Sequence, residues 1–492
     1  MRSLDGRFPE IKSQTGILLV LLFVPGILLL FIFPLQFPMF FWDEGLWNLG
    51  PKHAVTLGDP FAYGWYHIFL SPLHFFTTKI LYELLSPSLI YSKWMNGLFS
   101  IGIVIFTYLL ASTLYNRRTG FIAAILVMYN SMMIISARFA MLEPEVSFYM
   151  LGAAYFWFTR KKSLVLISTL FLASALLVKV YSLVLFPALI LGQLLLREQN
   201  SSRDRQWLRR VSPYQWAALL AGMSIAIICY ISISYINLEL FKSTWLGHTT
   251  QRESMFLFGG IPEELLSFAG IFRFVYKFMI HMPVMVILSL AGVFISLKYR
   301  KTGVYFFIFW FFLTFLMVSS QVYRPERYYF PIIPALAILA ASFFDQLFST
   351  WTKNNKRKVI LILVISLMCI FQILRLFPYW REGASSNRAF VDTASWINAN
   401  IEADEPILAM YQIALFVPNP VIPASEFWDE RWRASIDPDR DVKLPFASYM
   451  VMVFSRRAPD TQFNVWANEF VAENYSPVKS FAHFITVFKL KE

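Results

Sequence analysis

The chain has 492 residues, of which 57% are hydrophobic, 18% aromatic and 15% charged, and its formal net charge is +12. A soluble domain averages about 25% charged and about 45–50% apolar residues, so the composition excludes an ordinary soluble protein and indicates a polytopic membrane protein. The positive charge does not indicate a nucleic-acid partner, because Lys and Arg lie mainly in short loops between apolar runs, where they set membrane orientation. Two cysteines and six scattered histidines form no disulfide framework and no metal-ligand spacing, and we expect no cofactor.

Eleven apolar runs approach the roughly 20 residues that a helix needs to cross a bilayer. The first run is too long for a signal peptide and lacks a cleavage site, so we interpret it as an uncleaved span. The spans are predicted near 16–39, 90–114, 119–137, 145–159, 163–179, 180–196, 213–236, 281–298, 303–320, 328–348 and 358–378.

The charges of the loops orient these spans. Arg2, Arg7 and Lys12 place the N-terminus in the cytoplasm, because positive residues favour that side. The loops that alternation then places in the cytoplasm each carry at least two Lys or Arg; they are 116–118, 160–162, 197–210, 298–301 and 353–358. The sequence therefore predicts a multi-pass protein of the cell membrane whose C-terminus is extracytoplasmic.

Two of the predicted outer loops are long. The loop 41–90 contains the stretch 71–85, which mixes apolar residues with Thr77, Lys79 and Glu83 and suits a helix lying at the membrane interface. The loop 237–281 contains a Gly-Gly turn followed by an apolar stretch. We expect an interfacial helix in each loop.

Residues 380–492 contain no run long enough to span. Helical periodicity covers 389–401, and 460–474 also reads as a helix, whereas 407–411, 448–454 and 481–488 are rich in strand-forming residues. The chain is therefore predicted to consist of a transmembrane domain, 1–379, and a small extracytoplasmic α/β domain, 380–492.

Two adjacent carboxylates, Asp43 and Glu44, follow the first span directly. They are either solvated acids at the end of a span or a general base with its support. Beside Phe41 and Trp42, burial could raise the pKa of such a carboxyl group and let it accept a proton near neutral pH.

A second acidic site is predicted in the outer turn 137–145, which contains Arg138 and Glu143. One interpretation is an Arg–Glu ion pair that joins two helix ends, since surface ion pairs are common. The other places Glu143 beside Asp43 in one acidic site.

Basic residues stand at two other places on the predicted outer face. Lys179 ends the fifth span, where it could reach the interface or bind a phosphate. Arg324 and Arg327 lie in the tyrosine-rich stretch 323–331, against the usual distribution of positive charge, where they either anchor an aromatic belt or bind phosphate oxygens. Acids and bases on one face suit a lipid-phosphate-linked sugar, whose phosphate is the leaving group.

The order of these motifs resembles the GT-C polyprenyl-phosphate-sugar glycosyltransferases, in particular the protein O-mannosyltransferase and lipid A aminoarabinose transferase types. The shared features are Asp-Glu after the first span, an Ala-Arg-x-x-x-x-acid turn, a Lys ending the fifth span and a Tyr-x-x-Pro opening a late span, and they extend over nearly the whole chain. The resemblance implies a GT-C-like fold of about 11 spans.

The resemblance also implies roles for individual residues. Asp43 would activate the acceptor with support from Glu44, and Glu143 would stand where the family usually has an aspartate. Tyr328 would contact the donor phosphate. The remaining phosphate-binding candidates are Arg327, Arg324, Lys179 and Arg138.

One position departs from the family pattern. Ser71-Pro72 stands where aminoarabinose transferases carry Lys-Pro, and His67 or Lys79 could substitute for the lysine.

The predicted function is an inverting glycosyltransferase. It would take a sugar from a polyprenyl-phosphate carrier and pass it to a lipid, glycan or protein acceptor on the outer face, without a metal cluster, although a single ion at the acidic pair would fit. The alternative is a transporter or flippase of a lipid-linked sugar. A transporter is expected to have repeated halves or discontinuous helices with a site near the bilayer midplane. A non-catalytic scaffold that displays residues 380–492 gives no reason for Asp43.

Overall fold

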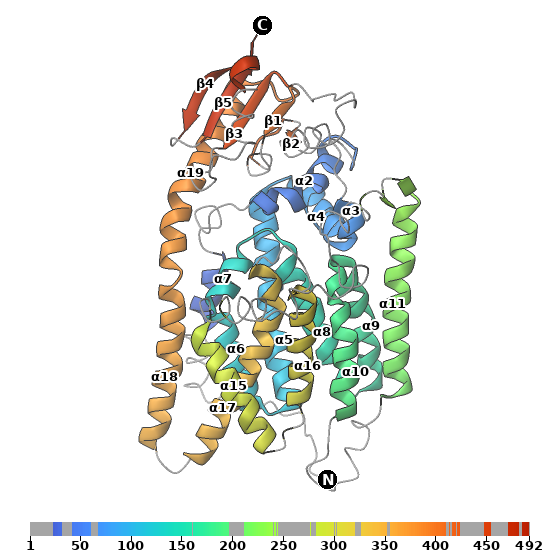
Figure 1. Cartoon of the computed structure of the whole chain (residues 1–492), viewed down its shortest axis with the longest axis vertical. Helices are drawn as coiled ribbons and strands as arrows, with labels where there is room; N and C mark the ends of the chain where they lie inside the picture. Colours follow the sequence, from blue (N-terminus) through green and yellow to red (C-terminus); the bar gives the residue numbers. More distant parts are fainter. Residues whose placement is uncertain are drawn as a thin grey trace.

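The computed structural model is a bundle of helices with a small β-sheet at one end (Figure 1). The residues that the structure describes are 23–31, 42–60, 67–159, 161–195, 211–239, 241–242, 244, 276, 282–299, 301, 303–319, 326–351, 355–409, 413, 416–419, 421–423, 447–453, 471–481 and 485–491.

The second to eleventh predicted spans each coincide with helical structure. Of the first, only 23–31 is described, and it is helical. The helices are α5 (Leu89–Leu114), α6 (Arg117–Met128), α7 (Ser131–Ala137), α8 (Leu142–Trp157), α9 (Lys162–Val178), η2 (Val180–Val184), α10 (Leu185–Leu195), α11 (Pro213–Ser234), α15 (Pro283–Lys298), α16 (Val304–Ser319), η4 (Glu326–Ile332), α17 (Ile333–Thr350) and α18 (Asn355–Leu374).

Three helical stretches within the described residues are long and apolar enough to cross a membrane on their own. They are Leu89–Leu114, Pro213–Ser234 and Arg327–Thr350. The pair α6 and α7 would make a fourth span if counted as one, and five further apolar helices are shorter. The chain is thus mostly helical, and it has helices suited to a membrane.

The span predicted at 119–137 is not one straight helix. Its two halves, α6 and α7, meet at an angle of 62°. Asn130 stands at the break, where its side chain accepts a hydrogen bond from the Met133 backbone N–H and caps α7. An asparagine side chain that bonds its own backbone competes with continuation of a helix, which explains the bend.

Small residues let α15 and α17 pack closely. A Cβ atom added at Gly292 would lie 1.8 Å from the carbonyl oxygen of Leu339, so the two backbones approach at this point as only glycine permits. Ser289 Oγ also donates to the carbonyl of Leu336 at 2.8 Å. Close approach through small and hydroxyl residues is typical of helices that pack in membranes.

Two loops predicted to be cytoplasmic meet at the same end of the bundle. Asp345 of α17 accepts a hydrogen bond from Asn116 Nδ2 at 2.8 Å and forms 3.7 Å ion pairs with Arg118 and Lys301. This cluster joins the loop before α6 to the loop before α16.

The opposite end carries α2 (Trp42–Thr56), α3 (His67–Leu70) and α4 (Pro72–Leu85), beneath the sheet (Figure 1). The helix expected at 71–85 is confirmed as α4, which exposes Phe76, Ile80 and Leu84. The sequence did not predict α2, since it contains two glycines and Pro51, which disfavour helix. The helix expected in 237–281 lies mainly outside the described residues.

The sheet has the strand order β2-β1-β3-β5-β4. Strands β1 (Ile407–Ala409), β2 (Val421–Pro423) and β3 (Tyr449–Val453) pair in parallel, whereas β5 (Ile485–Leu490) is antiparallel to both β3 and β4 (Tyr475–Phe481). The strands expected at 407–411 and 448–454 correspond to β1 and β3.

The strand expected at 481–488 overlaps β5 but begins too early along the chain. That stretch spans the end of β4 and the start of β5, because the hydrophobic pattern continues across the hairpin. The short strand β2 was also missed. The helix expected at 460–474 reaches the described residues only at 471–474, which are helical.

Helix α19 (Phe377–Asn400) links the bundle to the sheet. It begins just after α18 and passes without interruption through residue 380, so the two helices form a long column in Figure 1. Ala389, Phe390 and Ile397 of α19 pack in one apolar core with β1 and β3. Leu49 of α2 and Ala140 belong to the same core, which therefore joins the sheet to the top of the bundle.

Candidate functional site

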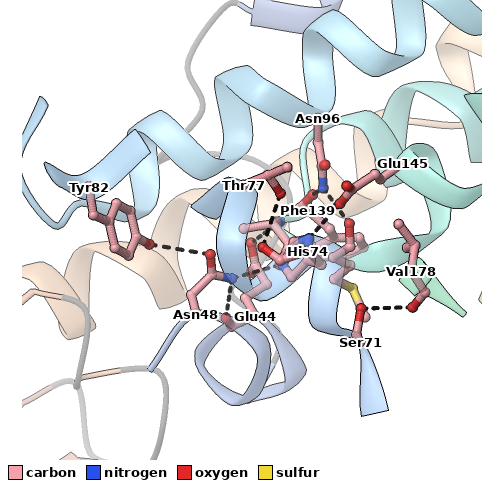
Figure 2. A network of polar contacts seen from close by, with 12 residues as sticks. Glu44, Asn48, Ser71, His74, Thr77, Tyr82, Asn96, Phe139, Glu145 and Val178 are labelled. Atoms are coloured by element: carbon pink, nitrogen blue, oxygen red, sulfur yellow. Dashed lines mark hydrogen bonds and ion pairs between the residues drawn. The ribbon is translucent and has the colours of Figure 1, made fainter. Parts of the chain in front are cut away.

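The first turn of α2 carries the two carboxylates that the sequence singles out. The side chain of Asp43 lies outside the described part of the structure. Glu44 is 1% exposed, and its Oε1 accepts a hydrogen bond from the Ala140 backbone N–H at 3.0 Å and pairs with Lys93 Nζ at 3.1 Å. Asn48 Nδ2 donates to the carbonyls of both Glu44 and Ala140 (Figure 2). Glu44 is therefore a buried anchor between α2 and the turn before α8.

Further amide and hydroxyl side chains hold this turn in place. Asn96 Nδ2 donates to the carbonyls of Phe139 and Met141, at 2.5 and 2.7 Å (Figure 2). The Tyr82 hydroxyl donates to Asn48 Oδ1 at 3.2 Å, and burial raises the pKa of Tyr82, which keeps it neutral. The start of α2 and the turn that precedes Glu143 thus share one polar network.

Arg138 caps the C-terminal end of α7. Its Nη1 donates to the carbonyl of Leu29 at 2.9 Å, and the side chain is buried. It also lies close enough to Lys93 to act on it electrostatically. Arg138 therefore connects the helical stretch 23–31 to the turn 138–141.

Three of the predicted site residues meet at Glu143. Lys179 Nζ lies 2.7 Å and Arg327 Nε 3.5 Å from Glu143 Oε1. Lys179 also lies over the Tyr328 ring, 4.1 Å from its centroid, and Arg327 lies 5.4 Å from the same centroid. Lys179 therefore points into a cluster, which we call the Glu143 cluster, rather than out along the membrane surface. Arg324 lies outside the described residues.

A histidine and a second glutamate form a separate pair beside this cluster. His74 Nδ1 lies 2.6 Å from Glu145 Oε2, and both side chains are buried (Figure 2). Ser71 Oγ donates to the carbonyl of Val178, the residue before Lys179. The start of α4 is therefore fixed against the end of α9, at the Glu143 cluster.

The two residues suggested as substitutes for a lysine at position 71 lie differently. Lys79 pairs with Glu83 on the exposed side of α4. His67 packs edge-on against Trp47, with ring centroids 4.5 Å apart. His74, which stands between them, contacts a carboxylate of α8, that of Glu145.

Glu143 and Glu145 serve different partners because of helix geometry. Both stand in the first turn of α8, where negative charge is favourable to the helix dipole. Residues two apart on a helix do not face each other. Glu143 therefore reaches α9 and η4, and Glu145 reaches α4.

Sequence analysis missed Lys93, His74 and Asn96. Lys93 gave a usable signal, because it stands next to an apolar run of more than 20 residues, and a charge in such a place usually has a specific partner. The partners of His74 and Asn96 lie far away along the chain, so their local sequence gave no comparable signal.

The Glu143 cluster combines one carboxylate with two cations and an aromatic ring. The cations remain partly accessible, since the side chains of Lys179 and Arg327 are 16% and 14% exposed. Both groups can donate charge-assisted hydrogen bonds to phosphate oxygens. Within the described part of the chain, no three His, Cys, Asp or Glu side chains lie close enough together to hold a metal ion.

Solved structures with the same architecture cover almost the entire chain. ArnT from Cupriavidus metallidurans in the apo state superposes with a TM-score of 0.65 at 14% identity, covering 97% of this chain and 98% of that one. The same protein bound to undecaprenyl phosphate gives 0.64, also at 14% identity, with 96% and 98% covered. The chain has the ArnT fold. The resemblance inferred from the sequence is confirmed at the level of the fold.

An archaeal enzyme has a similar architecture. The oligosaccharyltransferase AglB from Archaeoglobus fulgidus, in complex with an inhibitory peptide and a dolichol-phosphate, gives a TM-score of 0.57 at 11% identity and covers 90% of this chain and 70% of that one. No protein-family model and no curated protein matches the sequence. At these identities, the ArnT fold is what the comparisons establish.

Proposed function

We propose that this protein is a membrane glycosyltransferase that uses a polyprenyl-phosphate-linked sugar as donor. Its acceptor would be a lipid, glycan or protein on the outer face. The observation that carries the proposal is the Glu143 cluster, where Lys179, Arg327 and Tyr328 gather at the end of the bundle that carries α2, whose first turn contains Asp43. Structures with this fold are known with undecaprenyl phosphate and with dolichol-phosphate bound, which supports a lipid-phosphate donor.

The cations of the Glu143 cluster would bind the donor phosphate. As the bond between the anomeric carbon and the phosphate oxygen breaks, negative charge grows on the phosphate, and Lys179 and Arg327 would stabilise it. Glu143 holds both cations in place before the donor binds. Arg324 remains a candidate for the same role, whereas Arg138, which contacts Leu29, would support the turn rather than the phosphate.

Asp43 would activate the acceptor. It follows the end of the first predicted span and precedes Glu44, whose contacts with Lys93 and Ala140 fix the first turn of α2. A general base held on a rigid element can take the proton of the acceptor as the acceptor attacks the anomeric carbon. Attack opposite to the leaving phosphate inverts the anomeric configuration.

One observation favours the alternative function, a transporter or flippase. Helices α6 and α7 form a broken pair bent by 62°, and broken helices are frequent in transporters. Against it, the charged side chains of the candidate site, Glu44, Glu143, Lys179 and Arg327, gather at one end of the bundle rather than at its middle.

Reconstitution separates the two functions. Purified protein in liposomes would be given radiolabelled polyprenyl-phosphate sugars, and both transfer of label to an acceptor extract and movement of label between leaflets would be measured. We expect transfer by the wild type and none by Asp43→Asn. Asp59→Asn removes an exposed carboxylate from the same outer segment and should transfer normally. Movement of label without transfer, or full activity of Asp43→Asn, would contradict the proposal.

A further inference from the structure

His74 and Glu145 form a buried pair in which each side chain has one polar atom without a hydrogen-bond partner among the described residues. The two side chains are 1% and 0% exposed, and they meet through His74 Nδ1 and Glu145 Oε2 at 2.6 Å. Their other polar atoms, His74 Nε2 and Glu145 Oε1, are buried and have no hydrogen-bond partner within the described structure. Buried polar groups without a partner are rare and call for a functional or solvent explanation.

Two further polar atoms near this pair are also buried. Thr78 Oγ1, one turn after His74 on α4, and Asn96 Oδ1, whose amide nitrogen holds the turn before Glu143, are buried without a partner among the described residues. Bound water usually satisfies buried polar atoms of this kind. The pair therefore belongs to a group of buried polar atoms that bound water would satisfy, and Glu145 stands two residues after Glu143 on α8.

The carboxylates of Glu143 and Glu44 are each held by a cation. Glu143 is held by Lys179 and Arg327, and Glu44 by Lys93 and the Ala140 N–H. Nearby cations favour the ionised form of a carboxylate and weaken it as a base. His74 is different, because the hydrogen bond from Nδ1–H to Glu145 leaves the lone pair of Nε2 available and stabilises the imidazolium that forms when Nε2 takes a proton.

We propose that His74, oriented by Glu145, receives the proton that the acceptor loses during sugar transfer. The proposal rests on the glycosyltransferase function above. The acceptor O–H or N–H bond breaks, its electron pair forms the bond to the anomeric carbon, and the carbon–oxygen bond to the phosphate breaks with its electrons remaining on the phosphate. Asp43 takes up this proton first, as proposed above, and the proton then passes through water to His74 Nε2; the imidazolium later releases it to solvent.

Several titratable groups stand on the elements packed around His74 and set its electrostatic surroundings. On its own helix, Lys79 and Glu83 form an exposed pair, and Tyr82 is buried. The groups on the neighbouring elements are Glu44, Lys52 and His53 of α2, His67 of α3, Lys93 of α5, Glu143, Glu145 and Tyr149 of α8, and Lys179 at the end of α9. Of these, Glu145 makes the direct contact.

The pH dependence of transfer tests the proposal. Wild type, His74→Gln and Glu145→Gln would be compared in liposomes across about pH 5–9, the region in which imidazoles titrate. The donor would be the radiolabelled polyprenyl-phosphate sugar that the wild type accepts. In His74→Gln we expect kcat to fall on the order of 100-fold with little change in KM, and the loss of activity at acidic pH to disappear from the profile.

Glu145→Gln keeps the size of the side chain and an oxygen that accepts from Nδ1–H, so it provides a fold-preserving second variant. Its acidic limb should move to lower pH, since the imidazolium loses its counter-charge. Glu83→Gln is the matched control on α4 and should behave as wild type. Undecaprenyl phosphate binding, followed by tryptophan fluorescence, should be unchanged in all variants.

The outcomes are distinguishable. Unchanged kcat and an unchanged acidic limb in both variants would overturn the role of His74 while leaving the glycosyltransferase function intact. Loss of undecaprenyl phosphate binding in Glu145→Gln would likewise overturn it, because the pair would then be structural. Absence of transfer by the wild type with every donor would overturn the proposed function, and this inference with it.

Discussion

Removing Lys93 should strongly destabilise the outer end of the bundle. Lys93 and Glu44 are each 1% exposed and lie 3.1 Å apart. With an effective dielectric constant of about 20, two unit charges at that distance attract each other by about 5 kcal/mol. Replacing Lys93 by Met removes a counter-charge from the buried Glu44, and breaking a buried ion pair by removing one partner costs about 3–5 kcal/mol.

A double-mutant cycle isolates the pair. Lys93→Met, Glu44→Gln and the double variant would be unfolded with denaturant in mixed micelles, with tryptophan fluorescence as the signal. The double variant carries neither charge of the pair, and the amide introduced by Glu44→Gln still offers an oxygen to the Ala140 N–H, so most of the lost free energy should return. The exposed pair Lys79–Glu83 is the control, and Lys79→Met should change stability by less than about 0.5 kcal/mol. A coupling energy below about 1 kcal/mol for Lys93 and Glu44 would refute the reasoning.

Three further predictions concern other parts of the molecule. Lys179→Met should weaken binding of undecaprenyl phosphate by on the order of tenfold or more, measured by fluorescence titration, because a charge-assisted hydrogen bond is worth about 1.5–3 kcal/mol; unchanged affinity would remove Lys179 from the phosphate site. Gly292→Ala should lower the thermal unfolding midpoint, because its Cβ would lie 1.8 Å from Leu339 O and overpacking costs about 1–3 kcal/mol. Burial lowers the pKa of Lys52 to about 7. Above that pH the unfolded chain binds a proton that the folded chain lacks, so the free energy of unfolding should rise between about pH 7 and 10. Lys52→Met should flatten this slope in unfolding measurements.

The helical framework follows from the sequence, because each membrane helix satisfies its own backbone hydrogen bonds and only needs an apolar run of sufficient length. For that reason α5, α9, α11 and α15 end within a few residues of their predicted spans. Where the predicted elements differ from the structure, the cause is local. The bend at Asn130 depends on a capping hydrogen bond, and the hairpin between β4 and β5 interrupts a continuous hydrophobic pattern.

The candidate site was predictable only as a set of residue types. The sequence singled out Glu44, Glu143, Lys179 and Arg327 by their charge at the ends of apolar runs. It paired them differently from the structure, since Arg138 was one candidate partner of Glu143, and Lys179 and Arg327 occupy that place. The prediction that Glu143 lies beside the Asp43 side chain stays a prediction.

What the sequence determined by itself is therefore the class of molecule: a helical membrane chain with acids and bases at the ends of its spans, in the order found in GT-C enzymes. Charge and hydropathy act locally along the chain, so they can be read from it directly. Only the tertiary structure decided which partner each of these side chains contacts. Glu44 meets Ala140, His74 meets Glu145 and Glu143 meets Arg327 across long stretches of chain, and only the packing of α2, α4, α8 and η4 brings these partners together.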